Sequence, residues 1–322
     1  MARFILEFEK PLFELKNKLE ALKRTASSAK IDITQEIADL EEQIKRLRQR
    51  IYSRLSPWEK VQVARHPDRP KTLDYINLIF TDFIELHGDR LFRDDHSVIG
   101  GLAYLNHQRV MIVGHQKGKN ARENVVRNFG MSHPEGNRKA LRMMKLAEKF
   151  FLPLICFIDT PGAYPGIGAE ERGQGLAIAN NLMEMSALEV PVVVVNIGEG
   201  GSGGALAFGV GDRIFMLENA YYSVISPEGC ASILWRDEGK TAEAAEALKL
   251  TAQDLLKMGV VHGVIKEPPG GAHDDPHSVA VELKKVLVSS LSELKRIPPT
   301  ELLESRYLRL RNTGSFIEGE NS

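Results

Sequence analysis

The most constraining feature of this sequence is a cluster of glycines that directly follows a run of β-branched residues. Four consecutive valines at 192–195 lead into five glycines between Gly198 and Gly204, and small helix-forming residues follow. This order predicts a buried strand, a tight turn and the first turn of a helix. A helix start offers N–H groups without partners and a partial positive charge, and glycine lets another molecule approach closely. We therefore expect this stretch to hold a group that is negative or becomes negative during a reaction.

A second stretch, at 153–171, repeats the same order. A short apolar run ends in Asp159-Thr160-Pro161-Gly162, and a helix is expected after Gly166. Continuous apolar runs are typical of parallel strands that are covered on both faces. Loops at the carboxyl ends of neighbouring parallel strands commonly line one crevice. The two glycine-rich segments are thus expected to form two walls of one site.

The glycine stretch also fits two other motifs. The pattern Gly-x-Gly-x-x-Gly at 198–203, with Glu218 near the expected position of a ribose-binding acid, matches a dinucleotide fingerprint. Its late place in the chain and the short helix after it count against this interpretation. The pattern Gly-x-Ser-x-Gly at 200–204 matches a nucleophile elbow, which would make Ser202 the nucleophile of a serine hydrolase. Asp237 and His262 follow in the order that such an enzyme uses, and spacing alone does not exclude it.

Composition favours a cytoplasmic protein with no membrane or nucleic-acid partner. The 322 residues carry a formal net charge of −1, so no overall field attracts nucleic acid or an anionic membrane. No apolar run reaches the length of about 20 residues that a membrane span needs. Acidic residues among the first ten do not suit a signal peptide. The two cysteines, Cys156 and Cys230, lie far apart and show no metal-ligand spacing, which suits a reducing compartment and predicts no metal in this chain.

Periodicity divides the chain into four segments. Leucines recur at spacings of three and four between Leu12 and Leu22, and a second apolar series runs from Ile37 to Ile51. Both predict amphipathic helices, so residues 1–56 are expected to form an antiparallel hairpin with one apolar face left to cover. Residues 57–96 are expected to be a linker and a helix at 72–86, 97–297 an α/β domain, and 298–322 a tail. Within the domain we expect a strand hairpin at 97–115, a helix capped by Ser226, and helices at 135–150, 170–187, 241–258 and 276–294.

Longer motifs point to one family. They occupy residues 64–67, 72–75, 114–118, 127–131, 157–166, 168–174, 198–206, 222–235 and 270–273. In these segments the chain resembles the alpha subunit of the bacterial and plastid type of acetyl-CoA carboxylase carboxyltransferase. The resemblance covers nearly the whole chain, although the first ~55 residues and the tail match only in general character.

The resemblance implies an α/β chain with the crotonase (Clp protease-like) fold of repeated ββα units over 97–297. It implies transfer of the carboxyl group from carboxybiotin, on the biotin carboxyl carrier protein, to acetyl-CoA, which gives malonyl-CoA in the first committed step of fatty acid synthesis. It also implies a hetero-oligomer, with a carboxyltransferase beta subunit that carries a zinc ribbon and with biotin carboxylase. The alpha chain would be active only with the beta subunit. The lack of a four-cysteine pattern here fits the alpha chain.

The family pattern also implies a site. Gly203 and Gly204 would donate backbone N–H groups to the biotin ureido oxygen, which gains negative charge when carboxyl leaves. Such donors are fixed before the reaction, and one is worth about 3–4 kcal/mol in related acyl-transfer sites. The biotin pocket would be lined by Gly162, Ala163, Tyr164, Gly166 and Gly201.

For other residues near these motifs, the sequence predicts ordinary structural roles. Ser202 is expected to be a turn residue, and Glu170, Glu171 and Arg172 a solvated helix start. Four basic residues form a further stretch: Lys117, Lys119, Arg122 and Arg127. They could bind CoA phosphates or the partner chain, or they could form a solvated face.

Overall fold

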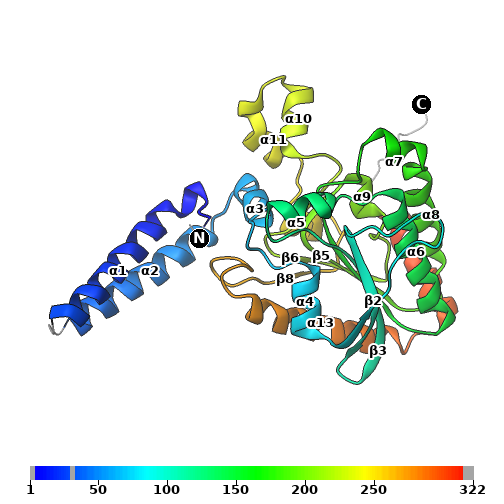
Figure 1. Ribbon diagram of the computed structural model, residues 1–322, viewed down its shortest axis with the longest axis horizontal. Coiled ribbons are helices and arrows are strands. Elements are labelled where there is room, and N and C mark those ends of the chain that lie inside the picture. The colour runs from blue at the N-terminus through cyan, green and yellow to red at the C-terminus, as the bar shows by residue number, and fades with distance from the viewer. Residues whose placement is uncertain (1–3, 30–32, 315–322) are drawn as a thin grey trace, which may run out of the picture.

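A single mixed β-sheet forms the centre of the protein, seen in the computed structural model of Figure 1. The structure describes residues 4–29 and 33–314. In this part of the chain the strand order is β1-β2-β3-β4-β5-β6-β8, and β7 pairs with the end of β5. The strands are β1 (Thr81–Glu85), β2 (Val98–Leu105), β3 (Gln108–His115), β4 (Leu154–Thr160), β5 (Val192–Gly201), β6 (Arg213–Leu217), β7 (Tyr221–Ser223) and β8 (Gly263–Ile265).

The central strands are parallel and fully buried, as their apolar runs predict. β1, β2 and β3 pair antiparallel, and β3, β4, β5, β6 and β8 pair in parallel. Every residue of β4 and β5 is buried. Successive side chains of β4 enter different cores: Ile155 and Phe157 pack on one face of the sheet, while Leu154 and Cys156 pack on the other.

Helices cover both faces of the sheet (Figure 1). Helix α6 (Pro134–Lys149) and helix α8 (Gln174–Ala187) contribute Met143, Met144 and Met185 to one core. Helix α4 (Thr72–Ile79) and helix α13 (Pro276–Leu294) contribute Tyr75 and Leu283 to the other. The other α-helices that follow the N-terminal hairpin are α3 (Pro57–Ala64), α5 (Ala121–Val126), α7 (Ile167–Glu171), α9 (Ser202–Leu206), α10 (Pro227–Leu234), α11 (Thr241–Ala247), α12 (Ala252–Lys257) and α14 (Pro299–Arg311). The short 3-10 helices are η1 (Glu7–Glu9), η2 (Asn128–Gly130) and η3 (Glu238–Lys240).

Three predicted helices are shorter than their apolar patterns. The helix expected at 72–86 ends at Ile79, and β1 follows it at once. The helix expected at 170–187 is broken at Gly173, whose φ of 79° separates α7 from α8. The helix expected at 241–258 becomes α11 and α12, with Lys249 at a φ of 49° between them. Ser226 caps α10 as predicted, because its hydroxyl accepts the N–H of Gly229.

The segment expected to be a tail instead packs on the core through α14. Arg306 of this helix is fully buried, and its guanidinium binds both carboxylate oxygens of Asp212 at 2.8 and 2.9 Å. The same group donates to the carbonyl oxygens of Met185 and Leu188, where α8 ends. A buried arginine in this role satisfies carbonyls that a helix end leaves without partners.

Helices α1 (Lys10–Ala29) and α2 (Thr34–Tyr52) form the predicted hairpin, which projects from the body of the molecule (Figure 1). Leu12 and Ile44 are buried, whereas the other apolar residues of the two stripes are only half-buried. Part of the apolar surface of the hairpin therefore stays accessible among the described residues. The sequence Asp32 to Gln35 resembles a capping box at the start of the second helix, but Asp32 lies outside the described residues. Among the helices that the structure describes, none is long and apolar enough to cross a membrane.

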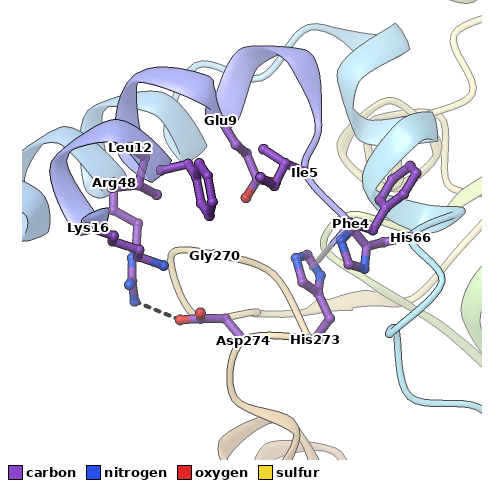
Figure 2. A pocket seen from close by; sticks show the side chains of 11 residues that line it. Phe4, Ile5, Glu9, Leu12, Lys16, Arg48, His66, Gly270, His273 and Asp274 are labelled. Atoms are coloured by element: carbon purple, nitrogen blue, oxygen red, sulfur yellow. Dashed lines mark hydrogen bonds and ion pairs between the residues drawn. The ribbon is translucent and has the colours of Figure 1, made fainter. Parts of the chain in front are cut away.

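A small cavity of about 30 Å³ marks where the hairpin joins the core (Figure 2). Arg48 of α2 reaches across it to the carboxylate of Asp274, at 2.6 Å. The ring of Phe4 packs edge-on against His66, with 5.2 Å between the ring centroids. The first contact joins α2 to the loop at 270–274, and the second joins the N-terminal segment to the residues that follow α3.

Candidate functional site

The carboxyl ends of β4 and β5 bring the two glycine-rich segments into direct contact. A Cβ added to Gly201 would overlap the carbonyl oxygen of Pro161. A Cβ added to Gly204 would lie 2.5 Å from the carbonyl carbon of Gly162 and 2.6 Å from the nitrogen of Ala163. The two backbones therefore touch without any side chain between them, and only glycine fits at these two positions. This close approach is the physical reason for the glycine cluster.

The turn comes later in the glycine stretch than its composition predicts. Strand β5 continues through Gly198 and Gly200 to Gly201, and the chain bends only at Ser202, whose φ is 47°. Helix α9 starts there, so the N–H groups of residues 202–205 have no acceptor within the helix. A Cβ on Gly203 would meet only Ile178 of α8, at 3.5 Å.

In the facing loop, two backbone N–H groups already donate to acceptors within the protein. The N–H of Gly162 donates to the Thr160 hydroxyl at 3.1 Å, and the N–H of Tyr164 donates to the carbonyl oxygen of Ser132 at 3.0 Å. Such amides are unavailable to a ligand unless these bonds break. The loop at 160–166 can therefore serve as a rigid wall, whereas α9 offers the donors.

Tyr164 and Gly166 lie on the outer side of this loop. The ring of Tyr164 is 4.2 Å from that of His133, and it covers Gly166 so closely that a Cβ there would be 2.5 Å from the tyrosine ring. Helix α7 begins directly after Gly166. The glycine thus leaves room for the tyrosine ring at the start of that helix.

Lys117 forms a buried ion-pair cluster at the base of both segments. Its ammonium lies 2.6 Å from Oδ1 of Asp159, in β4, and 2.7 Å from Oε1 of Glu199, in β5. Arg65 and the hydroxyl of Tyr221 bind the other oxygen of Glu199, each at 2.7 Å. Burial alone would raise the pKa of Glu199, but Lys117 and Arg65 outweigh it and hold that pKa at about 2.

The cluster borders a cavity of about 610 Å³ whose lining includes Lys117, Asp159, Pro161, Glu199 and Phe129. This cavity lies beside the carboxyl ends of β4 and β5. The lining also includes Arg65, Arg69, Lys71 and Lys119, so five basic side chains and only two carboxylates, Asp159 and Glu199, border this cavity. Sequence reasoning missed these roles of Asp159 and Glu199, since the partners of Lys117 lie 42 and 82 residues away along the chain.

The other basic residues of the predicted stretch are not part of this cluster. Lys119 is exposed and pairs with Asp74 at 2.6 Å, Arg122 is exposed, and Arg127 donates to the carbonyl oxygen of His96. The expectation of a solvated face is therefore right for Arg122 but wrong for Lys117.

Arg172 likewise departs from its expected role. It binds the fully buried carboxylate of Glu135 at 3.1 Å and lies 4.9 Å from the ring of Phe92. The prediction of a solvated charge pair is wrong for this residue, because its partner is on α6 and not on its own helix.

His115 is buried beneath α9. Its ring stacks on Phe208, with 4.3 Å between the centroids, and has no exposed surface. Burial, helped by the nearby charge of Lys117, lowers its pKa to about 3. His115 is therefore neutral at physiological pH.

Comparison with known proteins decides the family. Residues 5–314 match a family described as acetyl co-enzyme A carboxylase carboxyltransferase-like. A Geobacter metallireducens protein named acetyl-coenzyme A carboxylase carboxyl transferase subunit alpha is 56% identical over 317 residues, which are 98% of this chain and 99% of that protein. A Thermus thermophilus protein of the same name is 55% identical over 313 residues, 97% of this chain and 99% of that protein. The chain belongs to this carboxyltransferase family.

Solved structures agree with this membership at the level of the fold. Transcarboxylase 12S superposes with a TM-score of 0.58 at 20% identity, over 71% of this chain and 42% of that chain. A Pseudomonas malonate decarboxylase superposes with a TM-score of 0.56 at 16% identity, over 68% of this chain and 90% of that chain. The predicted crotonase-type fold is confirmed. Membership in the family also makes the chain an enzyme of the biotin-dependent carboxyltransferase type, the alpha part of a multi-subunit assembly.

The serine hydrolase alternative is not supported. Ser202 follows the carboxyl end of β5, whereas His262 precedes β8, which runs parallel to β6 and β5. The register places His262 level with Val194, eight residues before Ser202, so roughly 25 Å of strand separates them. His262 also uses its Nδ1 to accept the N–H of Ile214, and Asp237 caps η3. No triad can form from these three residues. The family match equally leaves the dinucleotide interpretation without support, since the glycines at 198–201 belong to a strand.

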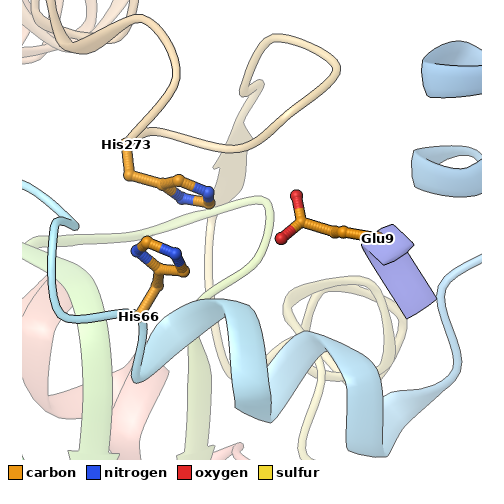
Figure 3. Close-up of side chains that lie close together, drawn as sticks. All are labelled: Glu9, His66 and His273. Atoms are coloured by element: carbon orange, nitrogen blue, oxygen red, sulfur yellow. The ribbon is translucent and has the colours of Figure 1, made fainter. Parts of the chain in front are cut away.

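One side-chain cluster has the composition of a metal site but not its geometry (Figure 3). Donor atoms of Glu9, His66 and His273 lie within 4.8 Å of one another. The two imidazoles are stacked 3.8 Å apart at an interplanar angle of 10°, so their ring-plane lone pairs run parallel instead of converging. Nδ1 of His66 accepts the N–H of Asp68, which leaves the ring proton on Nε2. The cluster therefore fits a contact between η1 and the core better than a cation site.

Proposed function

We propose that this chain is the biotin-side half of a carboxyltransferase that moves a carboxyl group from carboxybiotin, on a biotin carboxyl carrier protein, to acetyl-CoA, giving malonyl-CoA. The observation that carries this proposal is the start of α9, whose N–H groups lack helical acceptors and whose Gly204 packs against the wall at 160–166. The names of the relatives support acetyl-CoA as the acceptor.

The chain's own contribution to the chemistry is electrostatic. Carboxybiotin supplies an activated carboxyl group, and its ureido oxygen gains negative charge when that group leaves. Backbone N–H groups of Gly203 and Gly204 donate to this oxygen from positions that the helix start holds in advance. Each such donor is worth about 3–4 kcal/mol of transition-state stabilisation in comparable sites. The donor set fits the ligand, because the ureido oxygen accepts hydrogen bonds and the N-terminal end of a helix favours negative charge.

The remaining predicted pocket residues support these donors in different ways. Gly162, Ala163 and Gly201 set the distance between the wall and α9 by backbone contact. Tyr164 and Gly166 would form the rim of the proposed pocket, where the tyrosine ring packs on His133 and over Gly166. Main-chain packing of this kind would fix the proposed pocket before a ligand enters, which is the condition for electrostatic preorganisation.

The partner chains complete the proposal. A beta subunit with a zinc ribbon would bind the acyl-CoA and stabilise the second oxyanion, on the thioester, while biotin carboxylase would recharge the carrier. This chain would hold no metal of its own. The boundaries 1–56, 57–96 and 97–297 stay proposals; within 57–96, α4 packs on the core of the 97–297 segment and β1 pairs with its strand β2. A cytoplasmic location stays a prediction.

Reconstitution tests this function. The purified chain is mixed with its beta subunit and with carboxylated carrier protein, and malonyl-CoA formation from acetyl-CoA is measured. We expect turnover by the mixture and none by either chain alone, because each chain would supply one of the two oxyanion sites. Propionyl-CoA in place of acetyl-CoA tests the acceptor. Full turnover by this chain alone, or none by the mixture, would refute the proposal.

A further inference from the structure

We infer that Lys117 is a positioning residue, which holds the ends of β4 and β5 at the separation that sets the α9 amides against the wall at 160–166. This inference rests on the proposed function, because it assigns a role within the same site. It concerns a side chain that binds one carboxylate in each of the two glycine-rich segments, Asp159 in the first and Glu199 in the second.

The strand ladder needs such a clamp, since its register slips at this point. Ile158 pairs with Asn196, but the next pair is Thr160 with Gly200, so one residue of β4 lies opposite three residues of β5. The slip takes the N–H of Glu199 out of the ladder, and Oδ1 of Asp159 accepts it at 3.0 Å. A Cβ on Gly198 would lie 2.6 Å from the same oxygen. The Asp159 carboxylate thus fills the gap that the irregular pairing opens.

Lys117 makes this arrangement electrostatically possible. The side chains of Asp159 and Glu199 are only 6% and 8% exposed, and one ammonium bridges them. Without it, two carboxylates would face each other away from water, which disfavours the doubly charged state. Arg65 does not replace it, because Arg65 binds the far oxygen of Glu199 and continues to Glu228 of α10.

The bridge lies at the root of both segments of the site. Thr160, next to Asp159, bonds to the backbone of Gly162 through its hydroxyl. Gly201, two residues after Glu199, packs against Pro161. A change in the distance between Asp159 and Glu199 should therefore also change the distance between the wall and α9.

Replacement of Lys117 by methionine tests the inference in the reconstituted enzyme. Methionine keeps much of the apolar stem, which lies against Gly130, and removes the charge. We expect kcat to fall by about 100-fold, the loss typical of a misplacement of about 1 Å at a reacting centre. The KM for acetyl-CoA should stay unchanged, because that substrate is proposed to bind on the partner chain.

The pH profile separates positioning from plain stability. In Lys117→Met the paired carboxylates Asp159 and Glu199 should share a proton, so the rate should recover as the pH is lowered from about 8 to about 6, which wild type should not show. The other charged or titratable groups that act on them are unchanged in both proteins; these are Arg65, Arg69, Lys71, Tyr75, Tyr221 and Glu228. Lys117→Met/Asp159→Asn removes the repulsion and should regain at least part of the lost rate at the higher pH.

Lys145→Met is the matched control. Lys145 also bridges two carboxylates, Glu148 and Glu184, but on the surface and far along α6 from the site. Its loss should leave kcat and the pH profile as in wild type. A normal kcat and pH profile for Lys117→Met, with only a lower melting temperature, would overturn the inference. If Lys117→Met does not assemble, Glu199→Gln is the second test, because glutamine keeps the shape of the side chain and removes its charge. A wild-type kcat for Glu199→Gln overturns the inference, and a large loss of kcat supports it. Inactive wild-type protein would instead count against the proposed function.

Discussion

The contact between Gly204 and the wall at 160–166 makes a quantitative prediction for Gly204→Ala. The new methyl group would lie 2.5 Å from the carbonyl carbon of Gly162, about 0.9 Å short of the 3.4 Å at which ordinary van der Waals contact begins. Both neighbours are backbone atoms, so α9 and the wall must separate by roughly that amount. A shift of about 1 Å at a reacting centre costs about 100-fold in rate, and overpacking costs about 1–3 kcal/mol of stability. The assay is malonyl-CoA formation by the reconstituted enzyme, with thermal melting of the same samples.

Gly175→Ala, near the start of α8, is the control for this prediction. Its methyl group would meet no atom within 4 Å. The substitution is the same but leaves the contact between α9 and the wall unchanged, so the comparison isolates the change in spacing. We expect Gly175→Ala to retain most of the wild-type rate. Equal losses in the two variants, or a normal rate for Gly204→Ala, would show that the spacing of the two segments does not set the activity.

Two further predictions concern stability. Arg306→Ala should lower the free energy of unfolding by about 3–5 kcal/mol, because Asp212 would be left buried without its partner; Arg311→Ala, which loses only an exposed bond to Tyr307, should be nearly neutral in the same urea titration, and similar losses for both would contradict the reasoning. His115 should make the protein less stable as the pH falls from about 6.5 towards about 3. Over this range the imidazole binds a proton in the unfolded chain but stays neutral in the folded protein, because burial lowers its pKa to about 3. Between pH 7 and pH 5, His115→Phe should therefore lose about 2 kcal/mol less stability than wild type, and parallel curves would argue against a neutral buried ring.

Local patterns in the sequence predicted the centre of the fold well. Continuous apolar runs at 154–158 and 192–197 identify strands that must be covered on both faces, and those strands are the buried, parallel pair β4 and β5. Since glycines followed both runs, the meeting of the two segments was also predictable from the rule that carboxyl ends of parallel strands share one edge.

Tertiary contacts account for what the patterns missed. Glycines normally indicate a turn, yet β5 continues through Gly201 because Asp159 completes its pairing from the neighbouring strand. Charged residues are normally exposed, so Lys117 and Arg306 gave no local sign of burial, which depends on carboxylates 42 and 94 residues distant. For the same reason residues 299–311, rich in charge, did not reveal that one arginine ties them to the core.

The irregular pairing near Glu199 has a consequence for which sequence changes the protein can accept. Three residues of β5 lie opposite one residue of β4, and the chain bends shortly afterwards, at Ser202. The position of this bend relative to β4 therefore depends on the number of residues in the irregular pairing. Removal of one residue between Ile197 and Glu199 would turn every later side chain to the opposite face of the strand and rotate the start of α9 away from its neighbour. A substitution within this short interval leaves the number of residues unchanged, but an insertion or deletion alters it. Homologous chains should therefore preserve the number of residues in the interval as strictly as the identities of Gly198 and Glu199.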